Sequence, residues 1–192
     1  MTLEQVIQAV EKHTPNSIEK EDLEEYTQEA GVLVALYEEN NSVYVVLTRR
    51  SPHLSTHAHQ VSFPGGHQEE KDSDLWDTAL REAYEETKLD SSLPKMIGEL
   101  DPIVTVGSGT LIHPFVALLP NRPELTANSD EVEAIRHVDL AELLEEETWR
   151  EEYWERNGQS QAITFFEIPD ETIWGATANI LRQLLTLGLG IV

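Results

Sequence analysis

The chain has 192 residues, with 13 lysines and arginines against 36 aspartates and glutamates, so its formal net charge is −23 with histidine neutral. Such acidity argues against a general nucleic-acid-binding protein, because phosphate contacts need many basic residues on one face. No apolar run approaches the ~20 residues of a membrane-spanning helix, and Met1–Gln5 is not the basic start of a signal peptide. The lack of cysteine excludes disulfides, thiolate catalysis and cysteine-ligated metals. We therefore expect an acidic, cytoplasmic domain that binds neither nucleic acid nor membranes.

The first part of the chain predicts a helix followed by a β-hairpin. Thr2 is placed to cap the helix, and Gln5 three residues later would complete a capping box. Two apolar runs rich in β-branched residues follow, and the Asn-rich break between them is typical of a hairpin. The elements expected here are a helix over 2–12, a polar surface connection over 15–28, hairpin strands over 30–37 and 43–48, and a loop over 49–60.

The second part alternates short strands with helices, which predicts one α+β or layered α/β domain. Pro64-Gly65-Gly66 predicts a turn, and helical periodicity begins after it with Asp72 or Ser73 as the cap. The other expected elements are an extended piece over 61–63, a helix over 73–88, strands over 97–106 and 111–119 around Gly107-Ser108-Gly109, a strand over 131–138, a short helix over 140–146, a helix face carrying Trp149, Tyr153 and Trp154, a last strand over 163–168 and a helix over 171–187.

The most informative feature is a group of three glutamates in the helix predicted over 73–88. At about 100° per residue, Glu82, Glu85 and Glu86 share roughly a third of the helix circumference on the exposed side. Like charges at this spacing destabilise a helix by about 0.2–0.5 kcal/mol per pair, so Glu86→Gln is expected to stabilise the metal-free fold by that amount. One interpretation is a solvated acidic face, relieved by Arg81 and Lys88. The other is a site for a hard divalent cation such as Mg²⁺, which takes carboxylate oxygens.

Two basic residues and several histidines lie close to the Gly-Gly turn in sequence. Arg49 and Arg50 are interpreted either as an ordinary pair of charges at a strand end or as a phosphate-binding pair, because guanidinium groups make bidentate contacts with phosphate. His53 and His57 are spaced i,i+4 like zinc ligands only if this segment is helical, and Pro52 predicts a loop, which favours surface or substrate contacts over metal binding. The histidines of this region are His53, His57, His59 and His67.

The segment Phe63-Pro64-Gly65-Gly66, followed after fourteen residues by Arg81-Glu82-Ala83-Tyr84-Glu85-Glu86, resembles the sequence box of the Nudix hydrolases, G-x5-E-x7-R-E-U-x-E-E-x-G-U. Here Gly66 and Arg81 are one residue further apart, Asp72 stands at the first Glu of the box, and Lys88 stands at its last Gly. The resemblance implies an α/β/α sandwich around a mixed β-sheet over residues 29–192, with residues 1–28 as a helical extension.

The same resemblance implies a catalytic site that uses Mg²⁺ or Mn²⁺. It implies that Glu82, Glu85 and Glu86 are metal ligands together with the Gly65 carbonyl, and that Arg81 orients the carboxylates. Glu82 or a downstream glutamate, Glu131, is expected to accept a proton from the attacking water.

A narrower resemblance concerns the coenzyme A pyrophosphatase branch, whose signature is L-L-T-x-R-S-x3-R-x3-G-x3-F-P-G-G. Residues 46–51 and 63–66 match it, whereas Ser55 replaces its second Arg and His59 its first Gly. This resemblance implies cleavage of coenzyme A, with Arg50 and, less directly, Arg49 binding the substrate, and it leaves a homodimer open. The alternatives are another dinucleotide or nucleotide sugar as substrate, a Nudix-like nucleotide-binding module without turnover, and an acidic interaction domain without metal.

Overall fold

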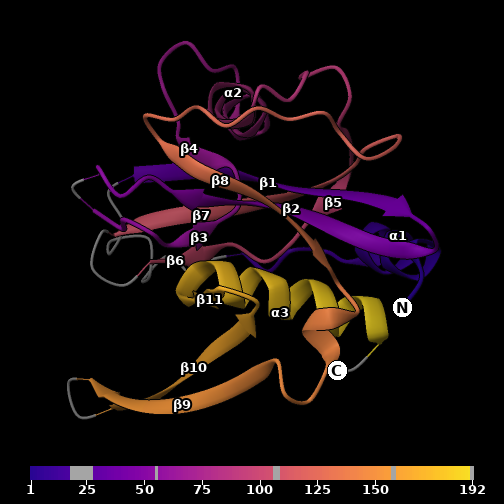
Figure 1. Cartoon of the computed structure of the whole chain (residues 1–192), viewed down its shortest axis with the longest axis vertical. Helices are drawn as coiled ribbons and strands as arrows, with labels where there is room; N and C mark the ends of the chain where they lie inside the picture. Colours follow the sequence, from indigo (N-terminus) through magenta and orange to yellow (C-terminus); the bar gives the residue numbers. More distant parts are fainter. Residues whose placement is uncertain (18–27, 55, 106–108, 157–158, 191–192) are drawn as a thin grey trace.

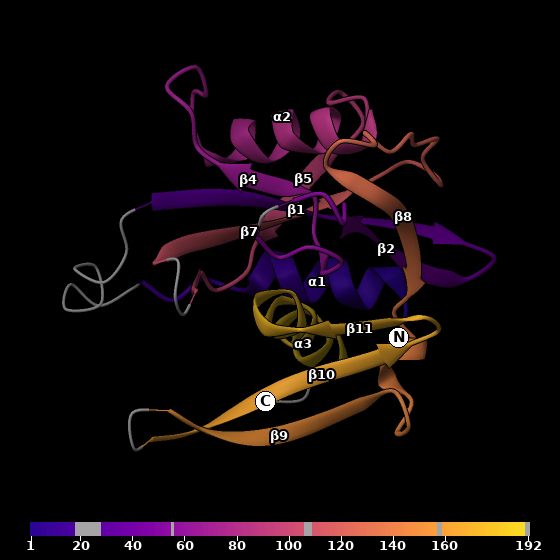
Figure 2. The same ribbon diagram turned by 60° about the vertical axis from the view of Figure 1, so that its left-hand side comes forward.

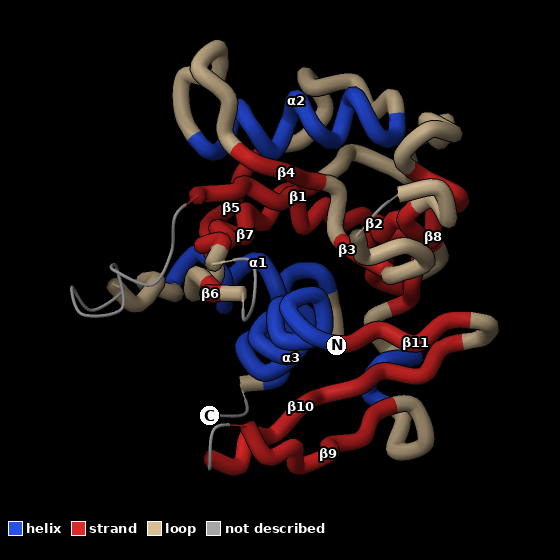
Figure 3. Tube along the Cα trace, turned by 90° about the vertical axis from the view of Figure 1, so that its left-hand side faces the viewer, coloured by secondary structure: helices blue, strands red, loops and turns tan. Residues whose placement is uncertain are grey.

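The computed structural model describes residues 1–17, 28–54, 56–105, 109–156 and 159–190. Helix α2 covers one face of a large β-sheet, and helices α1 and α3 cover the other, as Figures 1 and 2 show. A smaller three-stranded sheet lies beyond α3, at the far end of the molecule from α2 (Figure 3). Within the described residues, no helix is long and apolar enough to cross a membrane. The layered arrangement with a mixed sheet confirms the fold class expected from the sequence.

The large sheet is mixed, because β1 pairs in parallel with β7 and antiparallel with its other partners. The helices are α1 (Leu3–Lys12), α2 (Leu75–Thr87) and α3 (Gly175–Leu189), and η2 (Glu142–Leu144) is a 3-10 turn. The strands of the large sheet are β1 (Gln28–Glu39), β2 (Ser42–Arg50), β3 (Val61–Ser62), β4 (Gly65–His67), β5 (Lys95–Glu99), β6 (Ile103–Val104), β7 (Thr110–Leu118) and β8 (Val132–Asp139). The strands of the small sheet are β9 (Trp149–Arg156), β10 (Gln159–Ile168) and β11 (Glu171–Trp174).

Strand β1 divides the hydrophobic core into two layers, because side chains alternate between the faces of a sheet. Val34 and Leu36 pack toward α1 and α3, whereas Leu33 and Ala35 pack toward α2. All four side chains are fully buried. A central strand that is covered on both faces reads as a continuous apolar run, which explains the sequence of β1.

Helix α1 begins at the expected capping box, in which Thr2 and Gln5 exchange backbone and side-chain hydrogen bonds. Its apolar side chains Val6 and Val10 are buried in the same core layer as α3. At the other end of α1, His13 and Asn16 both contact the carboxylate of Asp101. The helix is therefore packed against the core by its apolar face and connected to Asp101 just after its C-terminal end.

The C-terminal third differs from the sequence prediction in three ways. Trp149, Tyr153 and Trp154 lie in strand β9 and are exposed, so their assignment to a packed helix face is wrong. The strand expected last, β10, is followed by β11, so α3 begins at Gly175 rather than near 171. The physical reason is the hairpin: β9 pairs with β10 along its whole length, and this pairing overrides the local helical periodicity.

The segment between β3 and α2 also differs from the prediction. Gly65 and Gly66 form strand β4, which pairs with β1, instead of a turn. Helix α2 is capped by Asp74, whose side chain accepts a hydrogen bond from the Asp77 backbone N–H, and not by Asp72 or Ser73 as expected. The Asp72 side chain instead binds Arg81. The run expected over 97–106 is interrupted between β5 and β6, and the short helix expected over 140–146 is the 3-10 turn η2. The expected turn at Gly107-Ser108-Gly109 lies largely outside the described residues.

Candidate metal centre

The two glycines of β4 let the backbone approach the acidic helix closely. A Cβ atom on Gly66 would lie 2.5 Å from Oε1 of Glu82, and a Cβ atom on Gly65 would lie 2.5 Å from the carbonyl oxygen of Gly31. At Gly65 the obstacle is backbone and φ is 156°, so only glycine fits there, whereas a side chain on Gly66 would displace the Glu82 carboxylate. The close approach places the β4 backbone directly beside the first glutamate of α2.

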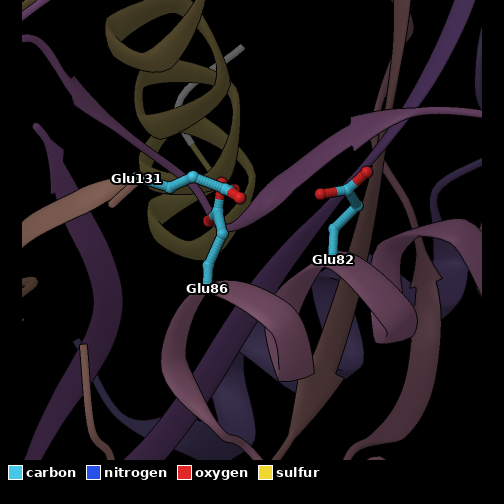
Figure 4. Close-up of side chains that lie close together, drawn as sticks. All are labelled: Glu82, Glu86 and Glu131. Carbon is cyan, nitrogen blue, oxygen red and sulfur yellow. The ribbon is translucent and has the colours of Figure 1, made fainter. Parts of the chain in front are cut away.

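Three carboxylates converge next to β4. Glu82 and Glu86 project from successive turns of α2, and Glu131 reaches them from the residue before β8 (Figure 4). One oxygen from each of the three side chains lies within 4.8 Å of the others. The three point into a common space, as the close-up shows. This arrangement suits a hard divalent cation, whose preferred protein ligands are carboxylate oxygens.

Backbone hydrogen bonds to the end of α2 and to β2 hold Glu131 in this position. The backbone N–H of Asn128 donates to the carbonyl oxygen of Glu86 at 2.8 Å. The backbone N–H of Glu131 donates to the carbonyl oxygen of Asn128 at 3.0 Å. The carbonyl oxygen of Glu131 in turn accepts the backbone N–H of Ser51 at 2.8 Å. Because these are main-chain contacts, no side-chain pattern in the sequence could have identified Asn128 and Ser51 as supports of the site.

Glu86 is the electrostatic centre of the cluster. Its side chain is 4% exposed, so the expectation that the three glutamates share an exposed face is wrong for this residue. Burial, strengthened by the negative charge of Glu82, raises the pKa of Glu86 to about 8, although nearby Arg50 acts in the opposite direction. Its Oε2 atom is buried and has no hydrogen-bond partner within the described residues. A buried carboxylate oxygen without a donor, facing two other carboxylates, fits the coordination of a divalent cation.

Arg81 braces the loop before α2 against the acidic residues of the helix. Its Nε and Nη2 atoms donate to the two oxygens of Asp72 at 2.8 and 2.9 Å. Its Nη1 atom donates to Glu82 at 2.8 Å and to Glu85 at 3.1 Å. This guanidinium holds the pKa of Asp72 well below its usual range. Asp72, which stands at the first acidic position of the box, therefore binds Arg81 with both carboxylate oxygens, although its side chain is shorter than that of Glu.

Glu85 is not among the carboxylates of the cluster that Glu82, Glu86 and Glu131 form. Its Oε2 accepts from Arg81, and its Oε1 lies 3.7 Å from Nζ of Lys71 on the loop before the helix. The structure therefore brings together two of the three glutamates expected as ligands and adds Glu131, which was expected as a base. The ligand roles of Glu85 and of the Gly65 carbonyl stay predictions.

The two arginines at the end of β2 have different surroundings. Arg50 lies close enough to Glu86 to lower its pKa, and its Nε atom is buried without a hydrogen-bond partner within the described residues. Arg49 forms ion pairs with Glu133 at 3.1 Å and with Glu171 at 3.4 Å, although its Nε atom, like that of Arg50, makes no hydrogen bond within the described residues. Of the two, only Arg50 lies beside the acidic cluster, and its role in substrate binding stays a prediction.

The histidines are distributed around the site rather than gathered in it. His59 contacts Glu133 and Arg49, His57 contacts Gln60, and His67 contacts Thr110. His59 has a φ of 61°, a left-handed conformation that favours glycine. The coenzyme A signature has glycine at this position, so the backbone there keeps the conformation that a glycine would adopt. Ser55, the other departure from the signature, lies outside the described residues.

The sequence has clear relatives among known proteins. The family model of the NUDIX domain matches residues 27–157 of this chain. The chain is 40% identical over 140 residues to "Uncharacterized Nudix hydrolase NudL" of Photorhabdus laumondii, covering 73% of this chain and 74% of that protein. It is 38% identical over 167 residues to "Nudix hydrolase 22, chloroplastic" of Arabidopsis thaliana, covering 83% of this chain and 55% of the plant protein. The chain thus spans about half the length of the plant relative.

Solved structures share the fold at low sequence identity. A MutT/nudix family protein from Enterococcus faecalis aligns with 99% of this chain and 75% of its own, with a TM-score of 0.55 and 14% identity. The NUDIX domain of Shewanella oneidensis NrtR, complexed with ADP ribose, aligns with 67% of this chain and 87% of its own, with a TM-score of 0.51 and 21% identity. With the fold, the acidic helix and the sequence relatives in agreement, the chain belongs to the Nudix hydrolase family.

Proposed function

We propose that the chain is a Mg²⁺- or Mn²⁺-dependent pyrophosphohydrolase that cleaves coenzyme A or a derivative of it. The observation that carries the metal dependence is the convergence of Glu82, Glu86 and Glu131 around the buried, unpartnered oxygen of Glu86. Three carboxylates this close repel one another and are stabilised by a cation that they share. A divalent cation held there supplies charge neutralisation at the bridging phosphates and lowers the pKa of a bound water.

The residues of the chain divide the remaining tasks. Arg50, next to Glu86 and with donor capacity to spare, is placed to hold a phosphate oxygen of the diphosphate. Glu131 is exposed and Glu82 is partly exposed, so either carboxylate can accept the proton of the attacking water. Arg81 keeps Glu82 oriented and is itself fixed by Asp72.

The choice of coenzyme A is supported by the position of the signature residues. Residues 46–51 form the end of β2, and residues 63–66 form the connection from β3 into β4. Both segments lead to the acidic cluster, through Arg50 and through Gly66. A substrate whose diphosphate is held by Arg50 and by a cation bound to Glu82 and Glu86 would therefore contact the signature residues as well.

The test is incubation of the purified protein with Mg²⁺ or Mn²⁺ and a panel of coenzyme A, dinucleotide and sugar-nucleotide diphosphates, with products identified by mass spectrometry. We expect coenzyme A to give adenosine 3′,5′-bisphosphate and phosphopantetheine, and Glu86→Gln to abolish turnover. Glu4→Gln on the distant helix α1 is the matched control and should keep full activity. If another diphosphate is hydrolysed and coenzyme A is not, the chain is still a pyrophosphohydrolase, but coenzyme A is not its substrate.

A nucleotide-binding module without turnover is the second candidate, and the NrtR domain complexed with ADP ribose supports keeping it. The same assay separates the two, because only an enzyme releases many equivalents of product per chain. Binding of a nucleotide diphosphate without product, in the presence of either metal, would favour the module. If neither metal raises the melting temperature, the site does not bind a cation and both candidates fail.

A further inference from the structure

Strand β9 forms an edge of the small sheet and carries exposed aromatic side chains. Within the described residues β9 pairs only with β10, and it is the outermost strand of the molecule (Figure 3). Trp149 is 47% exposed and Tyr153 is 72% exposed, on the same side of the strand. An edge strand presents unpaired backbone N–H and C=O groups, and native proteins seldom leave such an edge with exposed aromatic residues unless it has a partner.

The hydrogen-bond phase of β9 shows which residues offer these free backbone groups. The backbone N–H of Glu167 in β10 donates to the carbonyl oxygen of Thr148, its direct opposite in the register. Hydrogen-bonded and non-hydrogen-bonded pairs alternate along an antiparallel ladder. Arg150 and Glu152 therefore bond to β10, and the backbone groups of Trp149, Glu151 and Tyr153 point away from it.

We infer that β9 is the contact surface for a second copy of this chain, with the two β9 strands antiparallel across a two-fold axis at Glu151. A two-fold axis perpendicular to the sheet leaves each face of the sheet on the same side in both copies. Odd-numbered residues of one β9 strand therefore pair with odd-numbered residues of the other. Trp149 then lies opposite Tyr153 of the second copy, and Arg150 lies opposite its Glu152. Each pairing occurs twice, and aromatic and opposite-charge pairs are those that stabilise neighbouring strands.

The residue on the axis, Glu151, faces its own counterpart, and this chain already neutralises it. Its Oε1 atom lies 2.9 Å from Nη1 of Arg182 on α3. The neighbouring registers bring acidic residues together and form no pair of opposite charge between the copies. An axis at Tyr153 sets Glu151 against Glu155 of the second copy, and an axis at Glu152 sets two Glu152 carboxylates against each other in the closest type of pair. Of these three registers, the axis at Glu151 is the one that matches the charges, the aromatic residues and the backbone phase together.

A cysteine cross-link tests the register directly, because the chain contains no cysteine of its own. Glu151→Cys places two sulfur-bearing residues across the axis at a Cα separation of ~5.5 Å, within the range that a disulfide needs. Tyr153→Cys is the matched control, because its two copies would lie ~14 Å apart along the strands. We expect mild oxidation to cross-link Glu151→Cys and not the more exposed Tyr153→Cys. No cross-link for Glu151→Cys, or a cross-link only for Tyr153→Cys, would overturn the inference.

A charge exchange tests the same pairing without cysteine. We expect the full chain to show a concentration-dependent mass rising toward twice 21.7 kDa in light scattering. Arg150→Glu or Glu152→Arg sets like charges opposite each other twice and should weaken the association about tenfold, whereas the double exchange should restore it. Lys95→Glu, the same charge change on β5, is the control and should have no such effect. A chain that stays monomeric at every concentration, or a double exchange that restores nothing, rejects the proposed contact.

Discussion

At the scale of single residues, Glu86 is the most consequential side chain of the site. It is buried, it faces two other carboxylates, and its Oε2 atom has no hydrogen-bond donor within the described residues. Repulsion on an exposed helix face accounts for only a few tenths of a kcal/mol. Burial acts more strongly, and it raises the pKa of Glu86 to about 8. The metal-free protein therefore holds Glu86 protonated at neutral pH.

This protonation predicts how the stability of the metal-free protein depends on pH. The folded-state pKa of about 8 lies above the ordinary value of 4.5, so between these values the folded chain binds the proton more strongly than the unfolded chain. The contribution of Glu86 is fully present below pH 4.5 and is lost as the pH rises through 8. Glu86→Gln should remove this loss, so that the variant is the more stable protein at pH 9.

Urea unfolding in EDTA between pH 5 and 9 measures the effect. The two proteins should have similar free energies of unfolding at pH 5 and diverge as the pH rises. Parallel curves across the whole range would show that the Glu86 carboxyl is not the group that titrates.

At the scale of elements, helix α2 ends at a residue whose backbone conformation is unfavourable for its side chain. Lys88 follows the helix with a φ of 60°, the left-handed conformation that usually belongs to glycine. It is also the position where the Nudix box has its last glycine. The αL conformation is strained for a residue with a Cβ atom.

Lys88→Gly should therefore raise the free energy of unfolding by about 0.5–1 kcal/mol. The ammonium group of Lys88 also lies 5.0 Å from the ring of Tyr84, so a control must separate the side chain from the backbone. Lys88→Ala removes this contact and keeps the Cβ atom, and it should not stabilise the protein. Urea unfolding of both variants measures the difference, and equal gains in the two would mean that backbone strain is not the cause.

The brace between the β4–α2 loop and α2 is the second element-scale feature. The Asp72 side chain is 2% exposed and receives two hydrogen bonds from Arg81, one from Thr78 and one from the backbone N–H of Glu69. Asp72→Asn should lower the free energy of unfolding by about 2–3 kcal/mol at pH 7, because charge-assisted bonds to a buried group are lost.

The pH dependence of this loss is opposite to that of Glu86. The pKa of Asp72 is lowered in the folded chain, so its contribution is present above its ordinary value of 3.8 and is lost as the pH falls below it. The difference between wild type and variant should therefore shrink on acidification. A difference that is equally large at pH 3 and pH 7 would contradict an ionic role for Asp72.

At the scale of the whole molecule, an ion-pair cluster joins the small sheet to the large one. Glu171 in β11 has a side-chain exposure of 3% and accepts from Arg136 in β8 at 2.7 Å. Arg49 in β2 lies 3.4 Å from the same carboxylate. Three strands that are far apart in sequence therefore share one buried negative charge.

Removing this charge should loosen the attachment of the small sheet. Glu171→Gln leaves two guanidinium groups without their buried partner and should cost about 2–3 kcal/mol of unfolding free energy. Glu167→Gln on β10 is the matched control, because Glu167 and its partner Arg150 are both solvent-exposed and a surface pair contributes little to stability. Chemical denaturation compares the two, and equal losses would show that burial of Glu171 is not decisive.

Local sequence patterns were sufficient where a short-range rule decides the structure. The capping box at Thr2 and Gln5, the β1–β2 hairpin with Asn40 and Asn41 both at positive φ, and strand β8 all form as expected. The patterns misled where long-range pairing decides. The aromatic residues of β9 have no local signal that outweighs a helix, and Gly65-Gly66 become a strand only because β1 offers them a place.

The sequence by itself determined the family, the acidic helix and the residue types that a divalent cation requires, because these depend on spacing within one element. Only the tertiary structure decided that Glu131 rather than Glu85 joins Glu82 and Glu86, and that Arg50 rather than Arg49 lies beside them. The reason is that burial and main-chain contacts between distant segments set these positions. The bonds from Asn128 to α2 and from Ser51 to Glu131 leave no trace in the pattern of side chains.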